Sequence, residues 1–482
     1  MSEIALNYIA GAWVAGASET KNINPSDTND VVGLYTQGSR ADAEQAIAAA
    51  AAVAPRWARS TPQERHDVLK KVGDEILARR EELGRLLSRE EGKTLPEGIG
   101  EATRAGQIFL FFAAEALRLA GEKLASVRPG LDVEITREAV GVVGIIAPWN
   151  FPIAIPAWKI APALAYGNAV VFKPADLVPG SAYALSEIIS RAGLPAGVFN
   201  LVMGRGSVVG QAFLESPKVN AITFTGSVET GRKVAQACVL NDPMKKFQLE
   251  MGGKNPLVVL NDADLAVAAE CAVNGAFFST GQRCTASSRF IVQEGIHDAF
   301  VDAVTERLKA LKVDNALEAG THIGPVVDEK QLEQDLNYIE IGRSEGAKLH
   351  WGGERLNRAT PGFYLQPAFF TETTNAMRIA REEIFGPVAC TIRVKDYDEA
   401  LAVANDTPFG LSSGIVTTSL KYASHFKRNS EAGMVMVNTP TAGVDYHVPF
   451  GGRKGSSYGA REQGRYAAEF YTTVKTAYTN AG

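Results

Sequence analysis

The sequence has few cysteines, no long apolar run and no block of one charge sign. The cysteines stand at four scattered positions, 238, 271, 284 and 390. This spacing suits neither a disulfide framework nor a zinc knuckle, so we expect free thiols in a reducing compartment and no metal site. The most apolar runs, 140–148 and 169–172, have the length of strands, well short of the ~20 residues that cross a membrane. We therefore expect no membrane span.

The charge, the N-terminal residues and the length of the chain indicate further classes of protein to which it is not expected to belong. The 482 residues carry 49 Lys and Arg against 54 Asp and Glu, a formal net charge of -5, so we expect no nucleic-acid partner. Residues 1–10 include Glu3 and lack the pattern of a secretory signal, which favours a cytoplasmic location. The length exceeds that of a single core, so two or three domains are expected.

The first third of the chain is mainly helical. Helical patterns fill about 41–120, and Thr61, Pro62 and Glu64 form a capping box that predicts a helix start. Residues 132–143 instead alternate between polar and apolar types over their first half, which is typical of a half-buried strand or hairpin.

Beyond residue 140, β-branched runs alternate with helical segments, which predicts a doubly wound parallel sheet. These runs are 142–146, 169–173, 198–203 and 221–225. A second α/β set follows a strand at 257–260, so a domain boundary is placed near residue 250. The C-terminal 469–479 is predicted to be a strand that pairs with the 132–143 segment or with another subunit.

Three residues could carry chemistry. Cys284 follows the loop Gly281-Gln282-Arg283, where a thiol is accessible for attack and Arg283 would favour the thiolate, although most free cysteines only pack. Glu250 ends a strand before a glycine pair, where open α/β sheets place ligands; an ordinary turn carboxylate is the alternative. Asn150 lies between prolines, where its amide could stabilise an oxyanion or simply form a turn.

The common dinucleotide fingerprint is absent. Gly204, Gly206 and Gly210 are spaced one residue too far apart for it. Lys173 and Asp176, at the end of a predicted strand, could hold a ribose or be solvated turn residues.

Seven ordered motifs resemble those of the aldehyde dehydrogenase superfamily. They are PWNFP at 148–152, VFKPAD at 171–176, FTGS at 224–227, LEMGGKNP at 249–256, GQRC at 281–284, EEIFGPV at 382–388 and PFGGRKGSSYG at 449–459. The resemblance spans nearly the whole chain and implies an α/β fold in three parts, assembled as a homodimer or homotetramer. The parts are a Rossmann-type NAD(P)-binding domain (1–123 and 141–249), an α/β catalytic domain (250–449), and a small β oligomerisation element with the C-terminal segment (124–140 and 450–482).

The resemblance also implies roles. Cys284 would form a thiohemiacetal and a thioester with an aldehyde, Glu250 would be the general base, and Asn150 with the Cys284 backbone N–H would form the oxyanion hole. The implied cofactor is NAD, because Asp176 would repel a 2′-phosphate, with NADP as the alternative because Lys173 lies nearby. The residues implied in cofactor binding are Ile146, Trp149, Lys173, Asp176, Gly206, Gly210, Phe224, Ser227, Gly252, Glu383 and Phe385.

Residues 449–461 and 153–159 resemble the α-ketoglutaric semialdehyde dehydrogenases, which implies oxidation of that aldehyde to 2-oxoglutarate. Several relatives that take carboxylated semialdehydes have an arginine where Trp158 stands, so Arg283 and His447 become the candidate carboxylate partners. The residues expected to contact substrate are Trp158, Arg283, Thr285, His447 and Phe450. The alternatives are a hydrophobic or aromatic aldehyde, succinic semialdehyde, or a catalytically silent structural relative.

Overall fold

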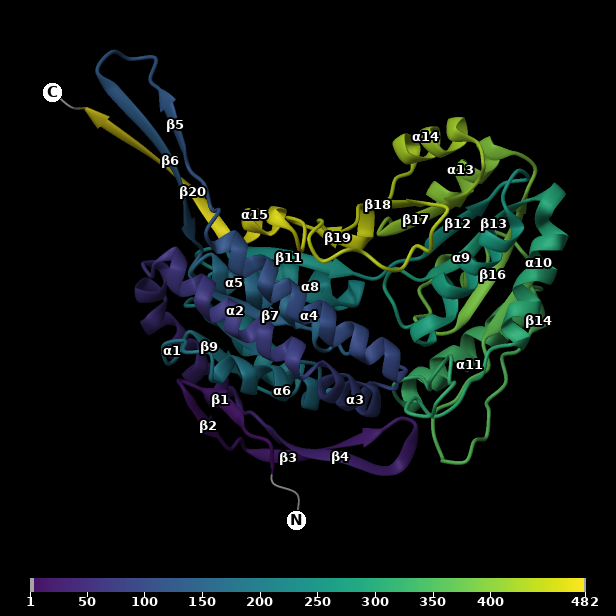
Figure 1. Ribbon diagram of the computed structural model, residues 1–482, viewed down its shortest axis with the longest axis horizontal. Coiled ribbons are helices and arrows are strands. Elements are labelled where there is room, and N and C mark those ends of the chain that lie inside the picture. Colours follow the sequence, from purple (N-terminus) through teal and green to yellow (C-terminus); the bar gives the residue numbers. More distant parts are fainter. Residues whose placement is uncertain (1–3, 481–482) are drawn as a thin grey trace.

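In the computed structural model, which describes residues 4–480, two α/β lobes face each other and a β arm projects from the first lobe (Figure 1). The first lobe is built on an eight-stranded sheet of order β19-β11-β10-β7-β8-β9-β1-β2, in which the strands from β11 to β9 are parallel. The strands are β1 (Asn7–Ile9), β2 (Ala12–Val14), β7 (Val142–Ile146), β8 (Ala169–Lys173), β9 (Phe199–Leu201), β10 (Ala221–Gly226), β11 (Lys246–Met251) and β19 (Ser457–Tyr458). The predicted parallel sheet is confirmed; the strand expected at 198–203 is shorter.

Helices cover both faces of this sheet and form two cores. One face is covered by α1 (Arg40–Ala58), α7 (Gln211–Glu215) and α8 (Val228–Leu240). The other is covered by α2 (Pro62–Ala78), α3 (Arg80–Glu91), α4 (Leu95–Ala116), α5 (Ala154–Ala165) and α6 (Pro179–Ser190). The predicted capping box of Thr61 and Glu64 starts α2. A hairpin of β3 (Ser18–Asn24) and β4 (Asp27–Gln37) lies along the base of this lobe (Figure 1).

The second lobe has a seven-stranded sheet of order β14-β15-β16-β13-β12-β17-β18, in which only β14 is antiparallel to its neighbour. Its strands are β12 (Asn255–Val259), β13 (Ser287–Gln293), β14 (Lys348–Trp351), β15 (Ala368–Thr373), β16 (Val388–Val394), β17 (Ser412–Val416) and β18 (Met434–Val437). Side chains alternate across the sheet: Phe290 and Val292 join one core and Ile291 the opposite one. The helices are α9 (Leu265–Phe277), α10 (Glu294–Lys309), α11 (Glu329–Ser344), α12 (Arg378–Arg381), α13 (Tyr397–Asn405) and α14 (Leu420–Asn429).

The projecting arm is an antiparallel sheet of order β20-β6-β5. It is formed by β5 (Glu122–Ala125), β6 (Leu131–Ala139) and β20 (Thr472–Asn480), and the last follows the short helix α15 (Ala468–Tyr471). The pairing of the C-terminal strand with the 132–143 segment is thus confirmed. That segment is not one element, because a turn at Gly141, with φ of 125°, separates β6 from β7 in the first sheet.

The chain passes from the first sheet to the second at residues 252–254, between β11 and β12, close to the position near 250 where the boundary was predicted. The segment 450–482 contributes to the first sheet as well as to the arm, because β19 pairs with β11. Among the residues that the structure describes, no helix is both long and apolar enough to cross a membrane.

Candidate active site

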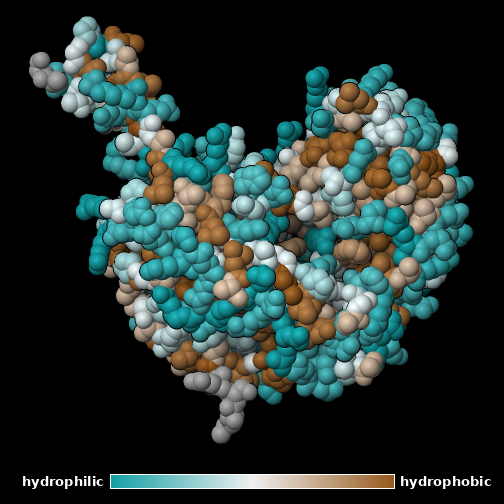
Figure 2. All heavy atoms as spheres, viewed as in Figure 1, coloured by the Kyte–Doolittle hydropathy of each residue, from teal (hydrophilic) through white to brown (hydrophobic). Residues whose placement is uncertain are grey.

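The carboxyl ends of three parallel strands meet at one edge of the first sheet. The strand β7 leads to Trp149 and Asn150, β10 leads to Ser227, and β11 ends at Glu250 and Met251. Of the parallel strands of this sheet, β7 comes first in the chain, with β8 on one side and β10 on the other. Open α/β sheets bind ligands where the strand order reverses in this way. A cavity of about 340 Å³ lies here, in the hollow between the lobes (Figure 2).

The loop that carries Cys284 begins with a strained turn. Ser279, Thr280 and Gly281 follow one another in the left-handed region, with φ of 51°, 57° and 66°. Glu97 on α4 stabilises this turn, since its carboxylate accepts hydrogen bonds from the Ser279 backbone N–H at 2.8 Å and from the Ser279 hydroxyl at 2.9 Å. Cys284 thereby lies between two cavities and lines both.

The Cys284 thiol is protonated at neutral pH in this environment. Burial raises its pKa to about 12, and the charges of Glu250 and Glu383 act in the same direction. Hydrogen bonds from the backbone N–H groups of Cys284 and Thr285 oppose the rise. The expectation that Arg283 favours the thiolate is wrong, because its guanidinium donates to Glu97 at 3.0 Å and the pKa of the thiol is raised.

Glu250 has one carboxylate oxygen fixed and one free. The hydroxyl of Ser457, opposite it on β19, donates to Oε2, while Oε1 is buried without a hydrogen-bond partner among the described residues. Burial raises the pKa of Glu250 to about 8, and the charge of Glu462 adds to this effect. Glu250 and Cys284 line the same cavity, as a base that activates water for a cysteine thioester must.

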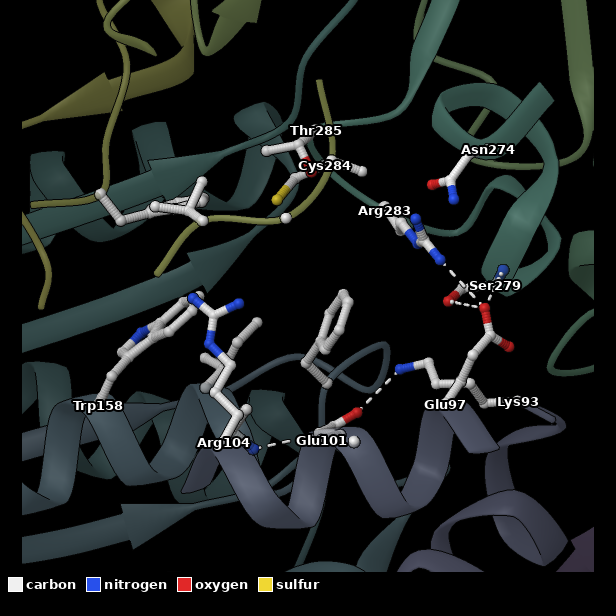
Figure 3. Close-up of a pocket in the computed structure, with 18 residues that line it drawn as sticks. Lys93, Glu97, Glu101, Arg104, Trp158, Asn274, Ser279, Arg283, Cys284 and Thr285 are labelled. Atoms are coloured by element: carbon white, nitrogen blue, oxygen red, sulfur yellow. Dashed lines mark hydrogen bonds and ion pairs between the residues drawn. The ribbon is translucent and has the colours of Figure 1, made fainter. Parts of the chain in front are cut away.

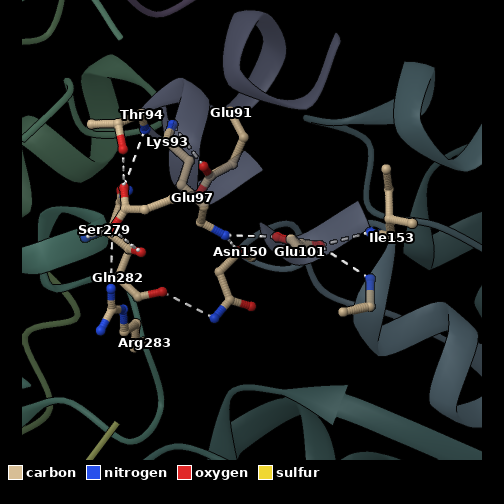
Figure 4. A network of polar contacts seen from close by, with 11 residues as sticks. Glu91, Lys93, Thr94, Glu97, Glu101, Asn150, Ile153, Ser279, Gln282 and Arg283 are labelled. Carbon is tan, nitrogen blue, oxygen red and sulfur yellow. Dashed lines mark hydrogen bonds and ion pairs between the residues drawn. The ribbon is translucent and has the colours of Figure 1, made fainter. Parts of the chain in front are cut away.

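A buried polar network positions Asn150 (Figure 4). Lys93 donates to the Asn150 backbone oxygen at 2.6 Å and forms an ion pair with Glu101 at 2.8 Å. Glu101 also accepts hydrogen bonds from the backbone N–H groups of Ile153 and Ala154. The Asn150 amide donates to the Gln282 carbonyl at 3.0 Å, beside the nucleophile loop. The network therefore links the expected oxyanion donor to α4 and to the loop of Cys284.

Five of the predicted cofactor residues line the cavity that holds Glu250. They are Trp149, Ser227, Gly252, Glu383 and Phe385. Phe385 makes an edge contact with Trp149 at 5.4 Å between ring centres. Glu383 accepts from the Gly253 N–H at 2.7 Å and leaves no room for a side chain at position 252, where a Cβ would lie 2.1 Å from its carboxylate.

The other predicted cofactor residues lie along the same edge of the sheet, outside the described wall of this cavity. They are Ile146, Lys173, Asp176, Gly206, Gly210 and Phe224. Lys173 is held by Asp176 at 2.9 Å and by the Pro174 carbonyl at 2.6 Å. Gly206 and Gly210, whose spacing differs from the common dinucleotide fingerprint, begin and end a π-helical turn that follows β9.

A second cavity, also about 340 Å³, is lined by Cys284 as well (Figure 3), and it shares Ile155, Trp158 and Phe450 with the first. Four of the five predicted substrate residues line it, namely Trp158, Arg283, Thr285 and Phe450. Trp158 stacks on Phe450 at 5.1 Å between ring centres. His447 is exposed and contacts Tyr446 instead. The sequence did not single out Arg104 on α4, although Glu97, Glu101 and Arg104 have the spacing that places three charges on one helix face.

A model of the aldehyde dehydrogenase family matches residues 13–477. The chain belongs to this family. It is 45% identical to the alpha-ketoglutaric semialdehyde dehydrogenase of Bacillus subtilis (strain 168), covering 98% of this chain and 97% of that one. It is 42% identical to the alpha-ketoglutarate semialdehyde dehydrogenase of Haloferax volcanii, over 99% of both chains. A crystal structure of betaine aldehyde dehydrogenase from Staphylococcus aureus in complex with NAD+ superposes with a TM-score of 0.96 at 34% identity, covering 99% of this chain and 95% of that one.

Proposed function

We propose that this aldehyde dehydrogenase oxidises α-ketoglutaric semialdehyde to 2-oxoglutarate with NAD+. The observation that carries the proposal is that Cys284 lines both cavities, one shared with Glu250 and the other with the predicted substrate residues. Aldehyde and cofactor can thus reach Cys284 through different cavities. The names of the Bacillus subtilis and Haloferax volcanii relatives support the choice of substrate.

The reaction begins when the Cys284 thiol loses its proton to solvent water and its sulfur bonds to the aldehyde carbon, which moves the carbonyl electron pair onto oxygen. The Asn150 amide and the Cys284 backbone N–H are the proposed donors to this oxyanion, and loss of one such donor typically lowers kcat by ~100-fold or more. Bound NAD+ supplies a hydride acceptor. Glu250 then takes a proton from water as the water oxygen attacks the thioester, and the Cys284 sulfur leaves as a thiolate when the acid forms.

The residues present fit a dinucleotide. Ser227 caps α8 by accepting a hydrogen bond from the Thr230 N–H, and the start of this helix opens to the cavity, where unpaired backbone N–H groups favour a pyrophosphate. The tight approach of Glu383 to Gly252 provides a carboxylate beside Cys284 for a ribose. We propose NAD over NADP because the Asp176 carboxylate holds Lys173, the cation that would otherwise attract a 2′-phosphate. The ratio of kcat/KM for the two cofactors tests this choice.

A panel of aldehydes with NAD+ tests the substrate. We expect kcat/KM for α-ketoglutaric semialdehyde to exceed the values for succinic semialdehyde, pentanal, benzaldehyde and betaine aldehyde, with release of free acid. Equal or higher values for pentanal or benzaldehyde would replace the assignment with the hydrophobic-aldehyde alternative. Absence of NADH formation with every aldehyde would favour a silent relative.

We also propose that the chain forms a homodimer or homotetramer through its arm and works in the cytoplasm. All residues of β5, and all of β20 except Thr472, are exposed in the single chain, including Leu124, Val474 and Tyr478. Exposed apolar side chains on projecting strands are typical of subunit contacts. Light scattering of the wild type and of Val474→Asp tests the assembly, and a monomeric wild type would refute it.

A further inference from the structure

The substrate cavity contains an unbalanced positive charge. Its wall includes five charged side chains, Lys93, Glu97, Glu101, Arg104 and Arg283. Lys93 pairs with Glu101 at 2.8 Å, and Arg283 pairs with Glu97 at 3.0 Å. Among the described residues of this wall, Arg104 is the cation left without a carboxylate partner.

The contacts of Arg104 are all neutral. One terminal nitrogen donates to the Gln463 amide oxygen at 2.9 Å, and the guanidinium lies 5.6 Å from the centre of the Trp158 ring. Figure 3 shows the side chain rising from α4 into the pocket, beside Trp158 and on the wall opposite Cys284. Burial lowers the pKa of Arg104, and the more distant charges of Glu101 and Asp445 oppose the fall without forming an ion pair with it among the described residues. A guanidinium stays charged at neutral pH.

Three buried N–H donors on Arg104 and on the two residues that contact it have no acceptor. In the described part of the chain, Arg104 Nε, Gln463 Nε2 and Trp158 Nε1 have no hydrogen-bond partner. A buried donor without an acceptor is destabilising, and more so when it is charged. Arg104 and Trp158 line the cavity, whereas Gln463 is not among its lining residues and contacts Arg104. A cation and an indole N–H without acceptors indicate a ligand that is both anionic and rich in acceptors. A 2-oxo carboxylate has this chemistry, with three oxygens on adjacent carbons.

We propose that Arg104 binds the 2-oxo carboxylate end of the aldehyde substrate and sets the preference for anionic over neutral and cationic aldehydes. This inference rests on the proposed function and assigns its specificity. The stacked Trp158 and Phe450 both line the cavity, where they can contact the methylene groups between the carboxylate and the reacting carbon. The cation comes from α4, so the aromatic residue at position 158 on α5 is compatible with an acidic substrate.

The test compares Arg104→Gln and Arg104→Lys with the wild type, and Arg118→Gln is the matched control. Arg118 follows α4, is exposed and pairs with Glu115. The readout is the ratio of kcat/KM for α-ketoglutaric semialdehyde to that for pentanal with saturating NAD+. This ratio cancels any loss of active protein.

We expect Arg104→Gln to lower the ratio by about 10- to 100-fold, mainly through KM for the acid, as loss of a charge-assisted hydrogen bond does. Arg104→Lys keeps the charge but loses the planar guanidinium, and it should lower the kcat/KM ratio about 3- to 10-fold. Arg118→Gln should leave it unchanged. Glutarate, which has carboxylates but no aldehyde, should inhibit the wild type competitively and Arg104→Gln at least about 10-fold less well.

The outcomes distinguish a failure of the role of Arg104 from a failure of the proposed substrate. A wild type that prefers the semialdehyde, together with an Arg104→Gln variant that keeps this preference, overturns the role of Arg104 and leaves the proposed function intact. A wild type without the preference refutes the proposed substrate first. If Arg104→Gln does not fold, the Arg104→Lys ratio decides, and an unchanged ratio overturns the inference.

Discussion

The pKa of Glu250 predicts how the rate of thioester hydrolysis depends on pH. Burial raises this pKa to about 8, and a general base works only in its ionised form. The carboxylate is therefore about one-tenth ionised at pH 7 and about nine-tenths ionised at pH 9. Because the raised pKa makes the base scarce at low pH, we expect the hydrolysis rate to rise about tenfold across this interval.

The assay is pre-steady-state formation of NADH, which separates hydride transfer from hydrolysis. When hydrolysis is slow, one equivalent of NADH forms in a burst and the later linear rate reports the breakdown of the thioester. We expect Glu250→Gln to keep the burst while the linear phase becomes slow and independent of pH between 7 and 9. Glu306→Gln, at an exposed position on α10, is the control and should follow the wild type.

Two results would refute this reasoning. If Glu250→Gln also loses the burst, Glu250 acts before hydride transfer, for example by taking the proton of the Cys284 thiol, whose own pKa is raised to about 12. If Glu250→Gln keeps the tenfold rise with pH, another group titrates. In that case the unpartnered Oε1 of Glu250 is not the base.

Three further predictions follow from the contacts. Cys284→Ala should abolish NADH formation, whereas alanine at the buried positions 238, 271 and 390 should leave most of it; a different lethal cysteine would reassign the nucleophile. Lys93→Met leaves its partner charge buried and unpaired, so urea unfolding should show a loss of about 3 to 5 kcal/mol, against less than about 1 kcal/mol for the exposed Lys70→Met. Arg283→Gln and His447→Gln should change kcat/KM for charged and uncharged aldehydes by the same factor, and a selective loss with the charged aldehyde would restore these residues as carboxylate partners.

Local sequence patterns predicted the elements that depend on local interactions. The capping box at Thr61 satisfies backbone groups within one helical turn, so the start of α2 needs no tertiary information. The strands β7 and β8 have the predicted bounds because their β-branched runs are buried on both faces of a parallel sheet. The contiguous motifs around Asn150, Glu250 and Cys284 likewise indicated the family, and the structure brings all three residues to one cavity.

The electrostatics of the site depended on pairings between distant segments. Arg283 was a candidate substrate partner until the fold placed Glu97, 186 residues away, beside it. Ser457 could not be linked to Glu250, 207 residues away, before β19 joined β11. Arg104 is one of several charged residues on α4. It has no carboxylate partner because Glu101 pairs with Lys93 and Glu97 pairs with Arg283. Sequence patterns determined which residue types were available. Burial and the choice of ion-pair and hydrogen-bond partner set the pKa values and the net charge in the cavity, and these arose only when segments far apart in the chain packed together.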